Sequence, residues 1–152
     1  MTGFGPIHQQ VFHRAPWSHT PEPQRGGIIP VLKGKQGEAL AEADLIARGF
    51  DVTGKRVTFK IDGVRSQNDF VAVKDGVYYF VEVKYGTGTL SSGQRHNLGL
   101  ADVGRKVIPL GGNAEKAGLA VGKPQSVRVL MIHVANGRVT YLTYQQFRSG
   151  EY

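Results

Sequence analysis

The sequence predicts an α/β (α+β) fold in which a central mixed β-sheet is flanked by helices, in the order αβββαβ(β). The chain has 152 residues, 40% of them hydrophobic, which is the size and composition of one domain with its own core. A helical segment comes first, strand-like segments then follow in succession, and a second helical segment separates them from the last strands.

Residues 1–30 differ from the rest of the chain in composition. They contain most of its prolines and a glycine pair at 26–27, without a sustained hydrophobic period: Pro6, Pro16, Pro21, Pro23 and Pro30. We interpret residues 1–30 as an irregular Pro/Gly-rich arm or linker and residues 31–152 as the folded domain. The first ten residues do not have the basic and apolar regions of a signal peptide.

The first predicted element is a helix over residues 33–49. Its apolar positions recur at helical spacing: Ala39, Leu40, Ala43, Ile46 and Ala47. Gly49 stands where a helix commonly ends with a left-handed residue, which favours glycine.

Strands are predicted next, at about 57–61, 68–74 and 77–85. In the first of them Val57, Phe59 and Ile61 alternate with polar residues, which is typical of a half-exposed strand. Asp62-Gly63 and Asp75-Gly76 separate the three segments, and Asp-Gly is a signal for a tight hairpin turn.

The remaining elements are predicted from capping and turn residues. Ser91 or Ser92 can cap a second helix that runs to about Lys106. Residues 109–126 are rich in glycine and predict a loop, with a short helix near 113–118. A final hairpin is predicted from strands at 127–134 and 138–144 around Asn136-Gly137.

The charge of the chain indicates a polyanionic partner. The net charge is +7, and nucleic acid is the most common partner of so basic a domain, although many small basic proteins have no such partner. The chain has no cysteine, which excludes disulfides and thiolate zinc sites. No apolar run reaches the roughly 20 residues that a membrane-spanning helix needs, so no membrane partner is expected.

The hairpin around Asp75-Gly76 brings charged residues together. If the turn has two residues, Lys74 pairs with Val77, and continuing this pairing places Asp69 opposite Glu82. Lys84 lies two residues beyond Glu82 and therefore on the same face. The same register places Gln67 opposite Lys84.

Two explanations fit this charged group. The lysine could neutralise the carboxylates in a structural ion cluster, but opposed like charges destabilise a sheet and one lysine does not compensate both. A divalent cation would compensate them, and Mg²⁺ prefers oxygen ligands. We therefore expect a metal site at this hairpin.

These residues resemble a known nuclease motif. Asn68-Asp69 followed at an interval by Glu82-Val83-Lys84 resembles the PD-(D/E)xK motif of restriction-endonuclease-like nucleases, with Asn68 in place of the motif's proline. The resemblance covers about residues 33–107 and implies a restriction-endonuclease-like core, with residues 31–152 as a nuclease domain.

The resemblance implies a role for each matching residue. Asp69 and Glu82 would bind Mg²⁺, or Mn²⁺ in its place, and the backbone carbonyl of Val83 would be a further ligand. Lys84 would position or activate the attacking water and offset charge on the phosphate. Glu38 in the first helix would face the site, and Gln94 near the start of the second helix would orient the lysine or the substrate.

Further residues near this hairpin are expected to contact the nucleic acid: Arg65, Gln67, Tyr85, Arg95 and His96. The spacing of the histidines fits no metal-ligand pattern. The sequence contains neither a P-loop, so no nucleotide cofactor is expected, nor the nucleophile elbow of esterases.

A small basic nuclease domain behind a Pro/Gly-rich arm resembles the toxin domains of bacterial effectors. This resemblance implies a DNase that is delivered within a larger secreted protein, acts in the cytoplasm of a target cell and is neutralised by a cognate immunity protein. The alternatives are a DNA repair or junction-resolving endonuclease, an RNA-cleaving toxin, and a non-catalytic nucleic-acid-binding module.

Overall fold

The computed structural model describes residues 28–150, and the side chains of residues 34–150. Its element bounds are α1 (Ile28–Ala47), β1 (Asp51–Ile61), β2 (Val64–Lys74), β3 (Val77–Tyr85), α2 (Ser92–Asp102), β4 (Ile108–Leu110), α3 (Gly111–Lys116), β5 (Arg128–Ala135), β6 (Arg138–Leu142) and α4 (Tyr144–Arg148). The arm predicted for residues 1–30 lies outside the described residues, except for 28–30.

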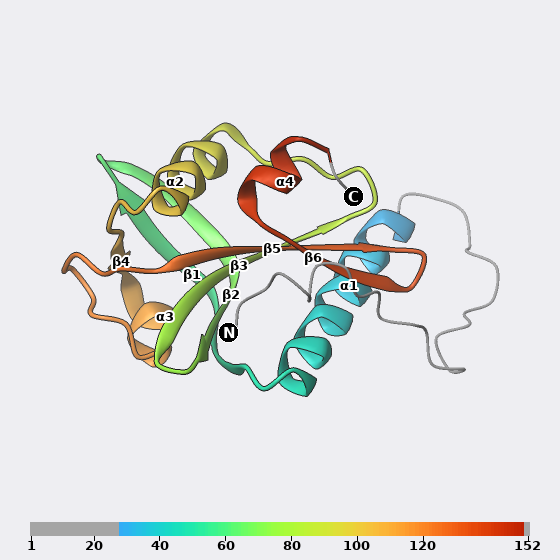
Figure 1. The fold of residues 1–152 in the computed structure, drawn as a ribbon, viewed down its shortest axis with the longest axis horizontal. Coiled ribbons are helices and arrows are strands. Elements are labelled where there is room, and N and C mark those ends of the chain that lie inside the picture. The colour runs from blue at the N-terminus through green and yellow to red at the C-terminus, as the bar shows by residue number, and fades with distance from the viewer. Residues whose placement is uncertain (1–27, 151–152) are drawn as a thin grey trace.

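A six-stranded sheet, in the order β4-β1-β2-β3-β5-β6, forms the centre of the domain. Strands β3 and β5 are parallel and the other neighbours are antiparallel, so the sheet is mixed. Helix α1 covers one face, while α2 and α4 lie on the other (Figure 1). This arrangement confirms the predicted mixed sheet flanked by helices and is the one expected of a restriction-endonuclease-like core.

Each face of the sheet has its own apolar core. Beneath α1, Ala41 and Leu45 pack on alternate residues of the central strands, including Phe70 and Val81. On the other face, Val71 and Phe80 pack with residues of α2, α3 and α4. Burial on both faces explains why β2 and β3 are apolar at successive positions.

The hairpin turns form where they are predicted. The first turn residues have positive φ angles of 52° at Asp62, 53° at Asp75 and 54° at Asn136, and a positive-φ glycine follows each of them. Two positive φ angles in succession define the turn type whose twist matches that of paired strands. These local signals therefore connect β1 to β2, β2 to β3 and β5 to β6 as expected.

Helix α1 differs from its prediction in its length and in the face that it buries against the sheet. It begins at Ile28 and has Pro30 near its start, where the missing N–H of proline costs no helical hydrogen bond. Its buried face carries Ala41, Asp44 and Leu45, whereas Ile46 is 57% exposed. Leu40 of the predicted stripe packs against the core, but the other predicted positions are exposed: Ala39, Ala43, Ile46 and Ala47. No helix in the described part of the chain is long and apolar enough to cross a membrane.

The second half of the chain also departs from expectation. Helix α2 ends at Asp102 rather than near Lys106, because Gly104 takes a φ of 101° and its N–H bonds back to Ala101. The predicted short helix in the glycine-rich loop is present as α3, but the loop also includes most of the short edge strand β4, which was not predicted. Helix α4 was not predicted; Thr143 caps it through a reciprocal bond with Gln146.

Strand β1 approaches α3 closely at Gly54. The pairing of β1 with β2 shifts register between Val52 and Gly54. A Cβ atom at Gly54 would lie 2.5 Å from the Cβ of Ala117, just after α3, so only glycine fits without displacement. This contact fixes the path of the strand just before it reaches the site described below.

We predict that Gly54→Ala lowers the free energy of unfolding by about 1–3 kcal/mol, since overpacking forces the backbone to shift. Gly34→Ala is the matched control. Gly34 lies in α1 with nothing within 4 Å of its added Cβ, and alanine there should stabilise the helix by roughly 0.5–1 kcal/mol. Denaturant unfolding of both variants checks this, and equal effects of the two substitutions would contradict it.

Candidate active site

The candidate site lies where β2 and β3 separate. Their ladder runs from Lys74–Val77 to Phe70–Val81, which confirms the predicted register, and then ends. Beyond it β2 stays paired with β1, and β3 with β5. The Oδ2 atom of Asp69 accepts the N–H of Val83 at 2.7 Å, so a side chain replaces the next backbone pair.

The separation corrects two predicted pairs. Asp69 and Glu82 are not ladder partners, and neither are Gln67 and Lys84, because the strands diverge after Phe70–Val81. Asp69 nevertheless remains close enough for its charge to raise the pKa of Glu82. The predicted group of two carboxylates and a lysine is therefore present, in an open fork rather than on a continuous ladder.

Glu82 is the buried centre of this group. Its side chain is 3% exposed and its Oε2 atom lies 3.4 Å from Nζ of Lys84. The same oxygen accepts a hydrogen bond of 2.6 Å from Nε2 of Gln94. Its other oxygen, Oε1, is buried and has no hydrogen-bond partner. Such an atom is rare in a folded protein and indicates a missing partner.

Helix α2 places Gln94 at the site through its cap. The Ser91 hydroxyl accepts the N–H of Gln94, while Oε1 of Gln94 accepts the N–H of Ser91 at 2.9 Å. Nζ of Lys84 lies 3.5 Å from this same Oε1 atom. Deeper in the helix, Nδ2 of the buried Asn97 donates to the Val64 carbonyl at 2.8 Å and ties α2 to β2. The structure thus brings Gln94 to both Glu82 and Lys84.

Burial dominates the electrostatics of both carboxylates. It raises the pKa of Glu82 from 4.5 to about 8; the nearby charge of Asp69 adds to this effect, and Lys84 and Gln94 oppose it. Burial also raises the pKa of Asp69, against the hydrogen bond from Val83. Without a metal, burial therefore shifts both carboxyl groups toward their protonated forms, and a bound cation would favour their charged forms.

Glu38 reaches the site from α1, on the opposite face of the sheet from α2. A pocket of about 280 Å³ beside Asp69 is lined by residues of α1, β1 and β2: Lys35, Glu38, Ala39, Glu42, Lys55, Arg56, Asp69 and Phe70. Within it, the guanidinium of Arg56 lies 3.2 Å from Oε1 of Glu38. The sequence prediction missed Arg56 and Lys55; their only signal was a basic pair directly after Gly54.

The donor set fits a magnesium ion of the kind that keeps most of its waters. Among the residues that the structure describes, no three His, Asp or Glu side chains form a ready metal site. Mg²⁺, however, is commonly held by one or two carboxylates together with water and substrate phosphate. The unpartnered Oε1 of Glu82 and the carboxylate of Asp69 offer that set. A role for the Val83 carbonyl stays a prediction.

The residues expected to contact nucleic acid lie on both sides of the sheet. Arg65, Gln67, Arg95 and His96 are exposed. Tyr85 instead lies against α1, since a Cβ atom added to Gly37 would be 2.9 Å from its ring. Tyr85 is therefore on the face opposite Gln94, and its contact with nucleic acid stays a prediction.

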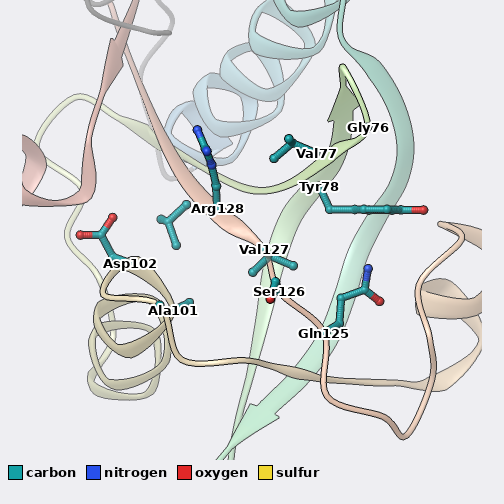
Figure 2. A pocket seen from close by; sticks show the side chains of 11 residues that line it. Gly76, Val77, Tyr78, Ala101, Asp102, Gln125, Ser126, Val127 and Arg128 are labelled. Atoms are coloured by element: carbon teal, nitrogen blue, oxygen red, sulfur yellow. The ribbon is translucent and has the colours of Figure 1, made fainter. Parts of the chain in front are cut away.

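A larger cavity, of about 760 Å³, lies at the other end of the sheet. Figure 2 shows Ala101 and Asp102 at the end of α2 on one side of it, with Tyr78 and Gln125 on the other. Asp102 is the one carboxylate among the residues that line this cavity. The larger cavity therefore lacks the convergent carboxylates of the fork, and the smaller pocket is the one beside the candidate chemistry.

Comparison with known proteins gives a partial match. No model of a known protein family matches the chain. A UPF0102 protein from a Nitratiruptor species is 38% identical over 58 residues, which are 38% of this chain and 48% of that protein. The chain thus spans about half the length of this curated relative, whose name states no activity.

The raised pKa of Glu82 predicts how stability depends on pH without metal. Between its ordinary value of 4.5 and about 8, the folded protein binds more protons than the unfolded chain. The free energy of unfolding should therefore fall as pH rises through this interval. Denaturant unfolding in EDTA should show this fall for the wild type and a weaker one for Glu82→Gln. Parallel curves for the two proteins would contradict the prediction.

Proposed function

We propose that this protein is a metal-dependent nuclease that hydrolyses phosphodiester bonds, with DNA as its substrate. The observation that carries the proposal is the fork itself. There, a buried carboxylate with an unpartnered oxygen lies beside a second carboxylate, a lysine and a glutamine. A buried ionisable cluster of this kind lowers the stability of the fold, and such clusters concentrate at active sites.

The roles of the residues follow from their contacts. Asp69 and Glu82 would hold Mg²⁺ or Mn²⁺, which when bound would polarise the phosphate and lower the pKa of a coordinated water. The ammonium of Lys84, which is 18% exposed, would stabilise negative charge that develops on the phosphate. Gln94 contacts Glu82 and Lys84 with separate atoms, so it holds both in a fixed relative position.

The basic character of the chain supports a nucleic-acid substrate. Its net charge of +7 favours a polyanion, and exposed cations lie on both sides of the fork. The partial match to the UPF0102 protein is compatible with this proposal, although the name of that protein states no substrate. An RNA substrate is the second candidate, because the same site chemistry acts on either backbone.

Cleavage assays test the assignment of the site. Purified protein is incubated with supercoiled plasmid or with total RNA, in Mg²⁺, in Mn²⁺ or in EDTA. We expect metal-dependent cleavage that falls at least about a hundredfold in Lys84→Ala, which removes transition-state charge stabilisation, and in Glu82→Ala, which removes a ligand of the metal.

Lys116→Ala and Glu115→Gln are the controls, because both residues are exposed on α3 and neither belongs to the fork. Wild-type cleavage in the controls and loss in the site variants would support the proposal. Cleavage of RNA alone would keep the site and change the substrate. Retained cleavage in Lys84→Ala and Glu82→Ala would overturn the site assignment.

The proposed biological role is that of an antibacterial effector domain with a cognate immunity protein. We expect expression in the bacterial cytoplasm to arrest growth and degrade the chromosome, and Lys84→Ala to abolish both effects. Growth without arrest, with an enzyme that is active in vitro, would instead favour a repair or junction-resolving nuclease.

A further inference from the structure

Arg56 has a backbone conformation that its place in a strand does not explain. Four non-glycine residues of the described chain have positive φ, and three of them are the hairpin-turn residues Asp62, Asp75 and Asn136. The fourth is Arg56, with φ of 51°, inside β1. This conformation costs an L-residue on the order of 1–2 kcal/mol, and such strain is concentrated at functional sites.

Contacts from α3 hold the strained segment in place. The Nδ2 atom of Asn113 donates to the backbone carbonyl of Arg56 at 3.2 Å. Two residues earlier, the close approach of Gly54 to Ala117 fixes the shifted register of β1. Figure 1 shows α3 beside this part of the sheet. The backbone is therefore positioned from outside the site, and the Arg56 side chain is directed into the pocket beside Asp69.

The ion pair that Arg56 makes there is too exposed to offset the strain. Its guanidinium lies 3.2 Å from Glu38, but the Arg56 side chain is 59% exposed. Lys55, also 59% exposed, makes a similar pair with Glu42 at 3.0 Å. Exposed pairs contribute about 0–1 kcal/mol. The Arg56 side chain therefore lies largely in solvent at the edge of the candidate active site.

We propose that Arg56 binds the phosphodiester backbone next to the scissile phosphate and that its pair with Glu38 is the resting state of the free protein. This inference rests on the proposed nuclease function. A guanidinium presents parallel donors that match two phosphate oxygens, which gives it geometric specificity as well as charge. When the phosphate binds, the Arg56–Glu38 pair opens, and the Glu38 carboxylate becomes available beside Asp69.

The phosphate and Glu38 therefore compete for one guanidinium. Removing the Glu38 charge should free Arg56 and tighten the binding of nucleic acid, but only in a protein that still has Arg56. If the Arg56–Glu38 pair has a purely structural role, the effect of removing the Glu38 charge on binding should not depend on Arg56. The resulting double-mutant cycle isolates the coupling from the general effect of removing a negative charge.

Binding is measured without metal, so that the test does not depend on cleavage. Fluorescence anisotropy in EDTA follows labelled DNA and RNA oligonucleotides over a range of salt concentrations, with wild type, Arg56→Gln, Glu38→Gln and the double variant. Arg128→Gln and Glu115→Gln are the charge-matched controls. Arg128 lines the distant cavity and Glu115 is exposed on α3.

We expect Arg56→Gln to weaken binding about tenfold and to lower the salt dependence by about one phosphate contact. Glu38→Gln should tighten binding beyond the effect of Glu115→Gln, and the double variant should lose that gain. The proposal is overturned if Arg56→Gln weakens binding no more than Arg128→Gln does. It is also overturned if Glu38→Gln tightens binding equally in a protein that lacks Arg56. If the wild type shows this pattern of binding but cleaves neither DNA nor RNA, the nuclease function is overturned but the phosphate contact is not.

Discussion

Glu82 is buried in the centre of a sheet, and burial disfavours the charged form of its carboxyl group. Two neighbours favour the charged form: Lys84 supplies a positive charge, and Gln94 donates to the same carboxylate oxygen. Asp69 disfavours it by adding a second negative charge. The separation of β2 from β3 makes room for all three, because a continued ladder would have filled this space with backbone pairs. The fork thus connects the electrostatics of one side chain to the topology of the sheet.

Local chemistry explains which parts of the fold could be predicted. The Asp-Gly and Asn-Gly turns require particular backbone angles, and they determined the hairpins and the register from Lys74–Val77 to Phe70–Val81. The group of Asp69, Glu82 and Lys84 followed from that register. The end of the ladder could not be predicted, because it depends on α2 entering the fork and on a side chain replacing a backbone pair.

Long-range packing explains the errors. Helix α1 presents Gly37 and Ala41 to the sheet, because Tyr85 and Val134 leave no space for larger residues at Gly37. A hydrophobic pattern gives weight to Ile46 instead, although Ile46 faces solvent. Arg56 was missed for a similar reason. Its conformation is imposed by α3, some 57 residues away along the chain at Asn113, and no local pattern around Gly54 shows it.

The side chain of Gln94 takes part both in the N-terminal cap of α2 and in the fork. One of its atoms completes the cap of α2 by accepting the Ser91 amide, and another donates to Glu82. The first turn of the helix and the buried carboxylate therefore cannot rearrange independently. Amide hydrogen exchange at Ser91 depends on how often this cap opens. Its rate therefore depends on whether Gln94 keeps its hydrogen bond to the buried carboxylate of Glu82. The stability of a helix terminus at the surface is thereby coupled to a hydrogen bond inside the fork.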